Sequence, residues 1–220
     1  MPKNETEIRC MPVELRAEEN ESGAMITGYP IVFNQEIDMG EWREVIDAGS
    51  MGDGTVLKDV MLLTNHDHST MPLARSRRNN DRSTMKLTPD QHGVAMQAML
   101  DTAGNPRAKE AYSAVGRGDI TGMSFAFIAS EERWEDLDTE KPLRRIMAFG
   151  WLPEVSLVNE PAYKGTSVQV ASEGEALDSV RASLESARKQ LAEERAREAE
   201  DARRTAAFER LEKLQKEVRA

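Results

Sequence analysis

Three short segments of this chain carry residue types that can do acid–base or covalent chemistry. The first is the segment 65–68 (NHDH), which follows a short apolar run. On an extended backbone, His66 and His68 would point to one side and Asp67 to the other. Such an imidazole can act as a general base, two imidazoles can bind zinc, or both can be ordinary polar residues at a strand end. Because the sequence has only one other histidine, His92, a zinc site would also need carboxylates.

The second segment is 122–127 (GMSFAF), which reads as a strand. Ser124 and Ala126 would share one face, and the large apolar side chains would fill the other. The small side chains around Ser124 leave room for the backbone of a peptide. A serine in a strand is usually structural, so this segment permits a nucleophile without demonstrating one.

The third segment is 154–163 (EVSLVNEPAY). Glu154 and Ser156 would share a face of a strand, and apolar residues would occupy the other. A carboxylate at the start of an apolar strand can orient an imidazole, although such a residue can also simply lie on the surface. Ser156 is a second candidate nucleophile on the same grounds as Ser124. Together the segments permit a site of serine, histidine and carboxylate.

Short strands and one helix must position these residues. The helix is predicted to begin with Asn105 as its cap and Pro106 at its first position, and to end near Gly116 or Gly118. Many short strands with one or two helices indicate a β-barrel or sandwich with helices on its outside. The predicted strands are 24–33, 60–63, a hairpin of 84–87 with 94–100, then 123–129, 145–151 and 154–158.

The last part of the chain differs from the rest in composition. Residues 175–220 contain no glycine or proline and are rich in Ala, Glu, Arg, Lys and Leu, which predicts one long helix. A short coiled-coil seam, spaced three and four residues apart, marks its beginning. Such a helix either stays solvated through salt bridges or docks on a partner or on a copy of itself. The seam consists of Leu177, Val180, Leu184, Ala187 and Leu191.

Charge and composition exclude several classes of protein. The formal net charge of -10 falls entirely on residues 1–173, because residues 174–220 carry 11 acidic and 11 basic side chains. An acidic chain is a poor candidate for binding nucleic acid through its phosphates. Cys10 is the only cysteine, so neither an internal disulfide nor a four-thiolate zinc site can form. With no apolar run long enough for a membrane helix and no signal-peptide pattern, we expect a cytoplasmic protein.

Taken in order along the chain, the motifs resemble those of the HK97-type prohead proteases, which mature the capsids of tailed bacteriophages. The resemblance rests on 28–33 (GYPIVF), 63–75 (LTNHDHSTMPLAR), the hairpin after it, 112–127 with its Gly-Met-Ser-Phe-Ala-Phe strand, and 154–163. These motifs cover roughly residues 25 to 170. Each motif alone is common, but the ordered set is specific.

The resemblance implies an α+β fold like that of the herpesvirus assemblins: a mostly antiparallel β-barrel with surrounding helices, here with a long C-terminal helix added. It implies that Ser124 is the nucleophile and His66 the base. Glu154 is then expected as the third member, because no histidine follows His92 to take the place it has in the assemblins. Ala126 stands where the family often has glycine, and His68 is a less favoured alternative base.

The resemblance further implies a serine endopeptidase without a cofactor or metal. It would cleave the scaffold, or the scaffolding segment of the major capsid protein, and itself. We expect a protease domain at 1–172 and a helical tail at 173–220 that self-cleavage removes. Its partners would be the capsid protein and a second copy of the chain, inside the prohead in the bacterial cytoplasm, and the source could be a prophage. The alternative is an inactive scaffolding protein that acts through its C-terminal helix.

Overall fold

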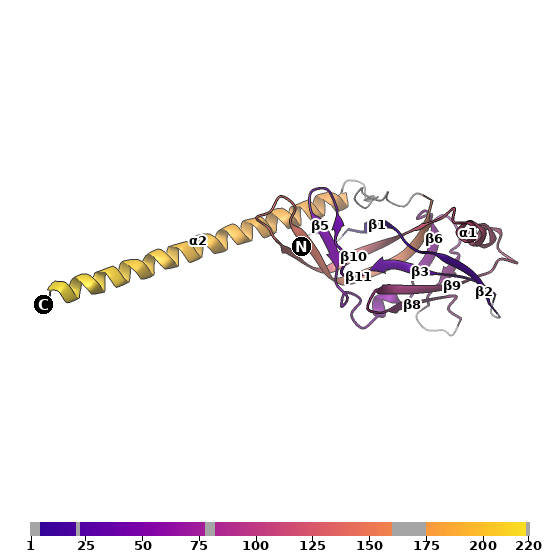
Figure 1. Ribbon diagram of the computed structural model, residues 1–220, viewed down its shortest axis with the longest axis horizontal. Coiled ribbons are helices and arrows are strands. Elements are labelled where there is room, and N and C mark those ends of the chain that lie inside the picture. Colours follow the sequence, from indigo (N-terminus) through magenta and orange to yellow (C-terminus); the bar gives the residue numbers. More distant parts are fainter. Residues whose placement is uncertain (1–4, 21–22, 78–81, 160–174, 219–220) are drawn as a thin grey trace. The chain divides into compact units, whose positions relative to one another are not determined.

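The computed structural model describes residues 5–20, 23–77, 82–159 and 175–218. The chain divides into two compact units, Met1–Ser179 and Val180–Ala220. The first unit contains all the described strands (Figure 1). Among the described helices, none combines the length and the apolar composition that crossing a bilayer requires.

A seven-stranded sheet carries the candidate site residues. Its two central strands, β10 (Gly122–Glu135) and β11 (Leu143–Val158), are long antiparallel neighbours (Figure 1). The order across the sheet is β1, β10, β11, β5, β4, and β6 pairs with both β11 and β7. β11 pairs in parallel with both β5 and β6. The other strands are β1 (Glu7–Pro12), β4 (Ile37–Asp38), β5 (Arg43–Ile46), β6 (Met61–Thr64) and β7 (Ala74–Arg75).

A second sheet of four antiparallel strands has the order β2, β3, β9, β8. β8 and β9 form the hairpin that the sequence predicts. Apolar side chains from both sheets fill one continuous core, in which the rings of Phe127 and Phe149 stack with centroids 4.7 Å apart. The strands are β2 (Arg16–Asn20), β3 (Gly23–Val32), β8 (Met85–Pro89) and β9 (Gly93–Leu100).

The helix α1 (Pro106–Arg117) follows its sequence signals closely. The Asn105 side chain accepts hydrogen bonds from the backbone N–H groups of Arg107 and Ala108, which caps the first turn. Gly118 ends the helix with φ of 77°, a left-handed conformation that glycine adopts at little cost. A short 3-10 turn, η1 (Thr55–Leu57), lies in the connection between β5 and β6.

These elements confirm the predicted α+β class with mostly strands and a long C-terminal helix. The described strands form two sheets, and no closed barrel is found among them, so the predicted barrel is not confirmed. The strands predicted separately at 145–151 and 154–158 are one continuous strand, β11, which runs through Pro153. Proline is tolerated there because the pairing with β10 shifts register at a bulge between Trp151 and Glu154.

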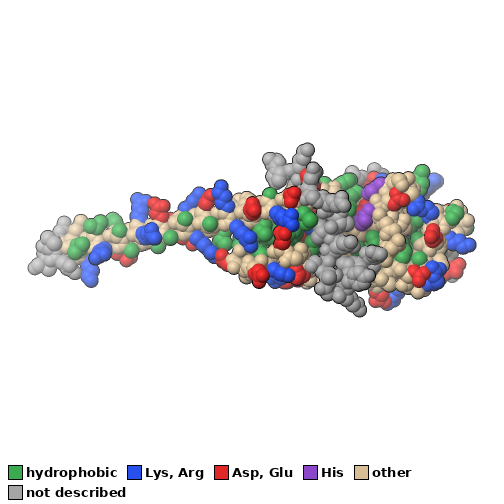
Figure 2. Space-filling view, turned by 90° about the horizontal axis from the view of Figure 1, so that it is seen from above, with side chains coloured by type: hydrophobic (Ala, Val, Ile, Leu, Met, Phe, Trp, Pro, Cys, Tyr) green, Lys and Arg blue, Asp and Glu red, His purple; other side chains and the backbone are tan. Residues whose placement is uncertain are grey.

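The helix α2 (Glu175–Val218) is continuous, as its composition predicts. In its first part, Val180 and Leu184 of the predicted seam are buried. Further along, Phe208, Leu211 and Leu214 are exposed. Figure 2 shows hydrophobic side chains among Lys, Arg, Asp and Glu side chains along this helix. The apolar residues of the two parts therefore differ in their exposure to solvent.

Four buried charged side chains and the partly exposed Glu132 form a cluster that joins four strands of the large sheet. Arg9 on β1 contacts Glu44 on β5 at 2.6 Å, and Arg144 on β11 contacts Glu7 on β1 at 2.6 Å. Arg144 also pairs with Glu132 of β10. Burial disfavours the charge of Glu44, but the two arginines outweigh this and lower its pKa to about 2. The ionised Glu44 thus stabilises the fold above about pH 4.5, and this contribution is lost as the pH falls toward 2.

Replacing Arg144 with methionine is expected to lower the free energy of unfolding by about 3 to 5 kcal/mol, because the buried carboxylates of Glu7 and Glu44 would share one arginine. Arg16→Met is the matched control: its ion pair with Glu14 is exposed, so its loss should change the free energy of unfolding far less. Denaturant unfolding of both variants measures the difference. Equal effects would show that the cluster contributes no more than a surface pair.

Candidate active site

The turn after β6 places His66. Thr64 is still paired with Leu157 of β11, but Asn65 and His66 then adopt left-handed backbone conformations with φ of 48° and 58°. The extended backbone assumed for the segment 65–68 in the sequence interpretation is therefore wrong. Such conformations are uncommon outside glycine and gather at functional sites, where surrounding contacts maintain them.

Hydrogen bonds from β11 hold this turn in place. The backbone N–H of Asn65 donates to the Leu157 carbonyl at 2.9 Å, and the N–H of His66 donates to Ser156 Oγ at 3.2 Å. The Asn65 side chain accepts from the N–H of Asn159 at 3.1 Å. The imidazole of His66 is thereby fixed beside the strand that carries Glu154.

His66 and Glu154 form a direct hydrogen bond. His66 Nδ1 lies 2.6 Å from Glu154 Oε1, and the glutamate side chain is fully buried. The other carboxylate oxygen accepts from Ser156 Oγ at 2.6 Å. A carboxylate that accepts a hydrogen bond from Nδ1–H leaves Nε2 as the basic nitrogen of the ring. In this geometry, Nε2 is the ring nitrogen of His66 that can accept a proton.

Ser124 lies on the neighbouring strand β10. It is directly opposite Ser156 on β11 and opposite Cys10 on β1, so that its Cα is about 5 Å from each of theirs. Its side chain is 0% exposed, and its hydroxyl donates to the backbone carbonyl of Arg9 at 2.8 Å. The structure thus brings His66 and Glu154 into contact, while the Ser124 proton is directed to Arg9 instead of to His66.

The other candidates take different places. Ser156 bonds Glu154 and the His66 backbone, so in this arrangement it holds the pair together. His68 is exposed, and its backbone N–H donates to the His66 carbonyl at 3.0 Å. Within the described residues, no three His, Cys, Asp or Glu side chains are grouped so as to hold a metal ion.

Two residues that the sequence interpretation did not single out support the site. Arg9, a member of the buried charge cluster, supplies the carbonyl that accepts from Ser124. Arg107 of α1 reaches Asp67 at 3.5 Å, which links the histidine turn to the helix. Hydrogen bonds from Ser69, with smaller contributions from Arg107 and Thr70, hold the pKa of Asp67 below its ordinary value. The alternation of charges at Glu7 and Arg9 in an otherwise apolar segment is the one sequence signal for the cluster.

A family model and a solved structure are similar to this chain. No curated protein sequence matches the chain. Among solved structures, the chain is similar to the bacteriophage T4 capsid assembly protease, with 13% identity and a TM-score of 0.41 over 70% of this chain and 99% of that one. The family model described as "Caudovirus prohead serine protease" matches residues 11–179, which is most of the chain. This chain therefore belongs to the caudovirus prohead serine protease family.

Proposed function

We propose that this chain is a serine endopeptidase in which Ser124 is the nucleophile, His66 the general base and Glu154 the residue that orients the imidazole. Its substrates are the scaffold or the scaffolding segment of the major capsid protein, and the protease itself, and it acts inside the prohead in the bacterial cytoplasm. The observation that carries this proposal is the hydrogen-bonded pair of His66 and Glu154, beside the strand that holds Ser124, in a member of a serine protease family.

The proposed reaction needs one rearrangement of a hydrogen bond. The Ser124 hydroxyl leaves the Arg9 carbonyl and donates to His66 Nε2, and Oγ attacks the scissile carbonyl as the proton moves to the imidazole. His66 then gives this proton to the leaving amine, and a water molecule hydrolyses the acyl-enzyme by the same route. Glu154 keeps its hydrogen bond to Nδ1 and stabilises the imidazolium in both steps.

The structure corresponds to a closed form of this site. Ser124, Ser156 and Glu154 are each 0% exposed, so a peptide cannot reach Ser124 Oγ in this conformation. Opening must expose the serine before the capsid protein is cut. A protease that remains closed until the prohead has assembled would not cut the capsid protein too early.

Co-expression with the major capsid protein of the same phage tests the proposed function. We expect mass spectrometry to find a shortened capsid protein and fragments of the protease, with every cut mapped by its new terminus. Capsid protein expressed alone is the control and should stay full length. A full-length capsid protein in the presence of the folded protease would contradict the proposal.

We further propose that α2 recruits the protease to the capsid protein by binding a helical scaffold segment, and that self-cleavage later removes this tail. Phe208, Leu211 and Leu214 are exposed at intervals of three residues, which makes them neighbours along the helix surface. Exposed apolar residues in such a row are typical of helices that dock on other helices. The same row would also allow self-association of two copies.

Changing Phe208, Leu211 and Leu214 together to glutamine is expected to lower the protease content of purified proheads several-fold. The helix should persist, because glutamine is a good helix former. Glu209→Gln with Arg210→Gln is the matched control on the charged surface, and it should leave incorporation unchanged. Quantitative mass spectrometry of proheads measures the ratio of protease to capsid protein. Equal incorporation of both variants would exclude recruitment through this row.

A further inference from the structure

A bulge in β11 brings Trp151 onto the face of the sheet that carries the candidate catalytic residues. Ser124 is opposite Ser156, Ala126 is opposite Glu154, and Ile128 is opposite Trp151. Paired residues of antiparallel strands share a face. The step from Ala126 to Ile128 is two residues, whereas the matching step on β11 is three. Without the extra residue, Leu152 would lie opposite Ile128. Because of the bulge, Trp151 takes this position, and Leu152 lies on the other face of the sheet.

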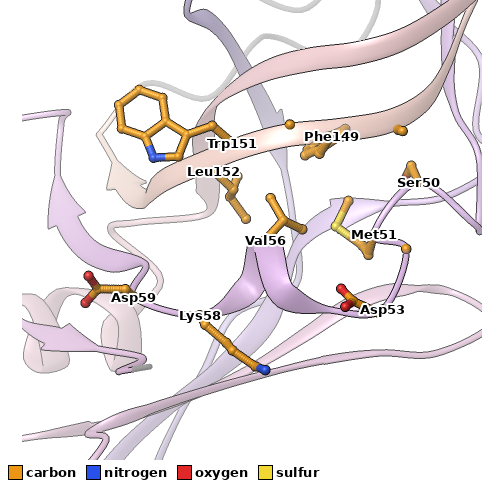
Figure 3. A pocket seen from close by; sticks show the side chains of 12 residues that line it. Ser50, Met51, Asp53, Val56, Lys58, Asp59, Phe149, Trp151 and Leu152 are labelled. Atoms are coloured by element: carbon orange, nitrogen blue, oxygen red, sulfur yellow. The ribbon is translucent and has the colours of Figure 1, made fainter. Parts of the chain in front are cut away.

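The two exchanged residues have opposite environments. Leu152 is buried in the core, whereas the Trp151 side chain is 51% exposed. Figure 3 shows the Leu152 side chain directed toward Val56 and the Trp151 ring extending away from it. An exposed tryptophan offers a large, rigid apolar surface, and tryptophan is among the residues that contribute most to the binding of proteins and peptides. Its position on this face points to a peptide as the ligand.

A pocket of about 320 Å³ adjoins Trp151. It lies where β11 passes from its pairing with β5, which ends at Ile146, to its pairing with β6, which begins at Glu154. Its apolar wall includes Met51, Val56, Phe149 and Leu152 (Figure 3). This volume is at the lower end of the range for ligand pockets, and it suits one large side chain.

The pocket also contains an unused hydrogen-bonding group. Ser50 lines it and is 1% exposed, and its hydroxyl has no hydrogen-bond partner within the described residues. A buried hydroxyl without a partner is costly, so it favours a ligand that supplies one. The carbonyl of Ser50 accepts from the Phe149 N–H at 2.9 Å, which fixes the loop against β11. An incoming peptide group would satisfy the hydroxyl without disturbing this contact.

We propose that Trp151 and this pocket form a subsite of the protease that binds a large apolar side chain of the substrate. The proposal rests on the proposed function. Ile128 lies four residues along β10 from Ser124, a distance of about 13 Å, and Trp151 is directly opposite Ile128 on β11. An extended peptide with its scissile bond at Ser124 therefore presents to the subsite a side chain about four residues from the bond that is cut.

Co-expression with capsid-protein variants tests this subsite. Once the cut is mapped, each large apolar residue within five positions on either side is changed singly to alanine, and the rate of processing is followed over time. With the wild-type protease, one such change about four residues from the cut should slow processing about 10- to 100-fold. Trp151→Ala should slow processing of the unaltered capsid protein to a similar extent.

The decisive result is the combination of the two changes. The Trp151→Ala protease should process the sensitive capsid-protein variant about as fast as it processes the unaltered capsid protein. The substitution in the protease and the one in the capsid protein remove the same contact, so their effects should not add. Met71→Ala also removes an exposed apolar side chain, and it should leave the pattern of sensitive positions unchanged. An unchanged pattern with Trp151→Ala would overturn the subsite while leaving the proposed function intact. Absence of any processing by the wild-type chain would overturn both.

Discussion

Ser124→Ala should abolish processing of the capsid protein and of the protease itself, with a fall in rate on the order of 10⁶-fold. Without Oγ no acyl-enzyme can form, and the remaining groups can only position a water molecule. Rates of processing in the co-expression system, read by mass spectrometry, measure the loss. The variant should fold, because the alanine side chain fits the space of the serine and Ser124 makes its hydrogen bond to a backbone carbonyl.

Ser156→Ala is the matched control for this prediction, because Ser156 is the buried serine directly opposite. It removes the hydrogen bond to Glu154 and the acceptor for the His66 N–H, and we expect a fall of about 5- to 150-fold, the cost of leaving the buried Glu154 oxygen without its donor. If Ser156→Ala abolished processing and Ser124→Ala did not, the two serines would exchange roles.

His66→Gln is expected to reduce processing by a similar factor, on the order of 10⁶-fold, because a nucleophile and its base act as one unit. Glutamine can still hydrogen-bond to Glu154 but has no basic nitrogen to accept the Ser124 proton. The double variant of His66→Gln with Ser124→Ala should be no slower than either single variant. This lack of additivity is the measurement that separates a base from a residue that only supports the fold.

His68→Gln is the control for His66→Gln, since it makes the same change two residues away in an exposed side chain. We expect normal processing from it. A loss with His68→Gln and none with His66→Gln would make His68 the base. Loss with both, together with inactivation by a chelator, would instead favour a metal hydrolase.

Local signals in the sequence were sufficient for several elements. Asn105, Pro106 and Gly118 mark both ends of α1, and the uninterrupted composition after Gly174 marks α2. The hairpin of β8 and β9 follows from alternating apolar residues around a Pro-Asp turn. In each of these cases the relevant interactions join residues close together in the chain, so a short segment determines the structure.

Local sequence signals do not predict which distant segments of the chain pair with one another. β1 and β5 contain Glu7, Arg9 and Glu44, which read as solvent-exposed charges but are buried because they pair with one another. The contact of His66 with Glu154 joins residues far apart in sequence; the residue types permitted it, and together with the family resemblance they led us to expect it. The left-handed backbone at His66 depends on bonds to β11; asparagine and histidine adopt this conformation more often than most residues, but their types alone do not require it.

The order of strands in the large sheet also limits how early during translation the sheet can form. β1 ends at Pro12, but its partner β10 begins only at Gly122. β5 and β6 also pair with a strand that is synthesised much later, β11. Translation of the intervening stretch takes about 5 to 20 s, and during that time β1 has no partner. Sheets built from such distant pairings also fold slowly, in milliseconds to seconds. Nascent chains that stop before Val158 therefore lack the complete pair of central strands, β10 and β11, on which the large sheet is built.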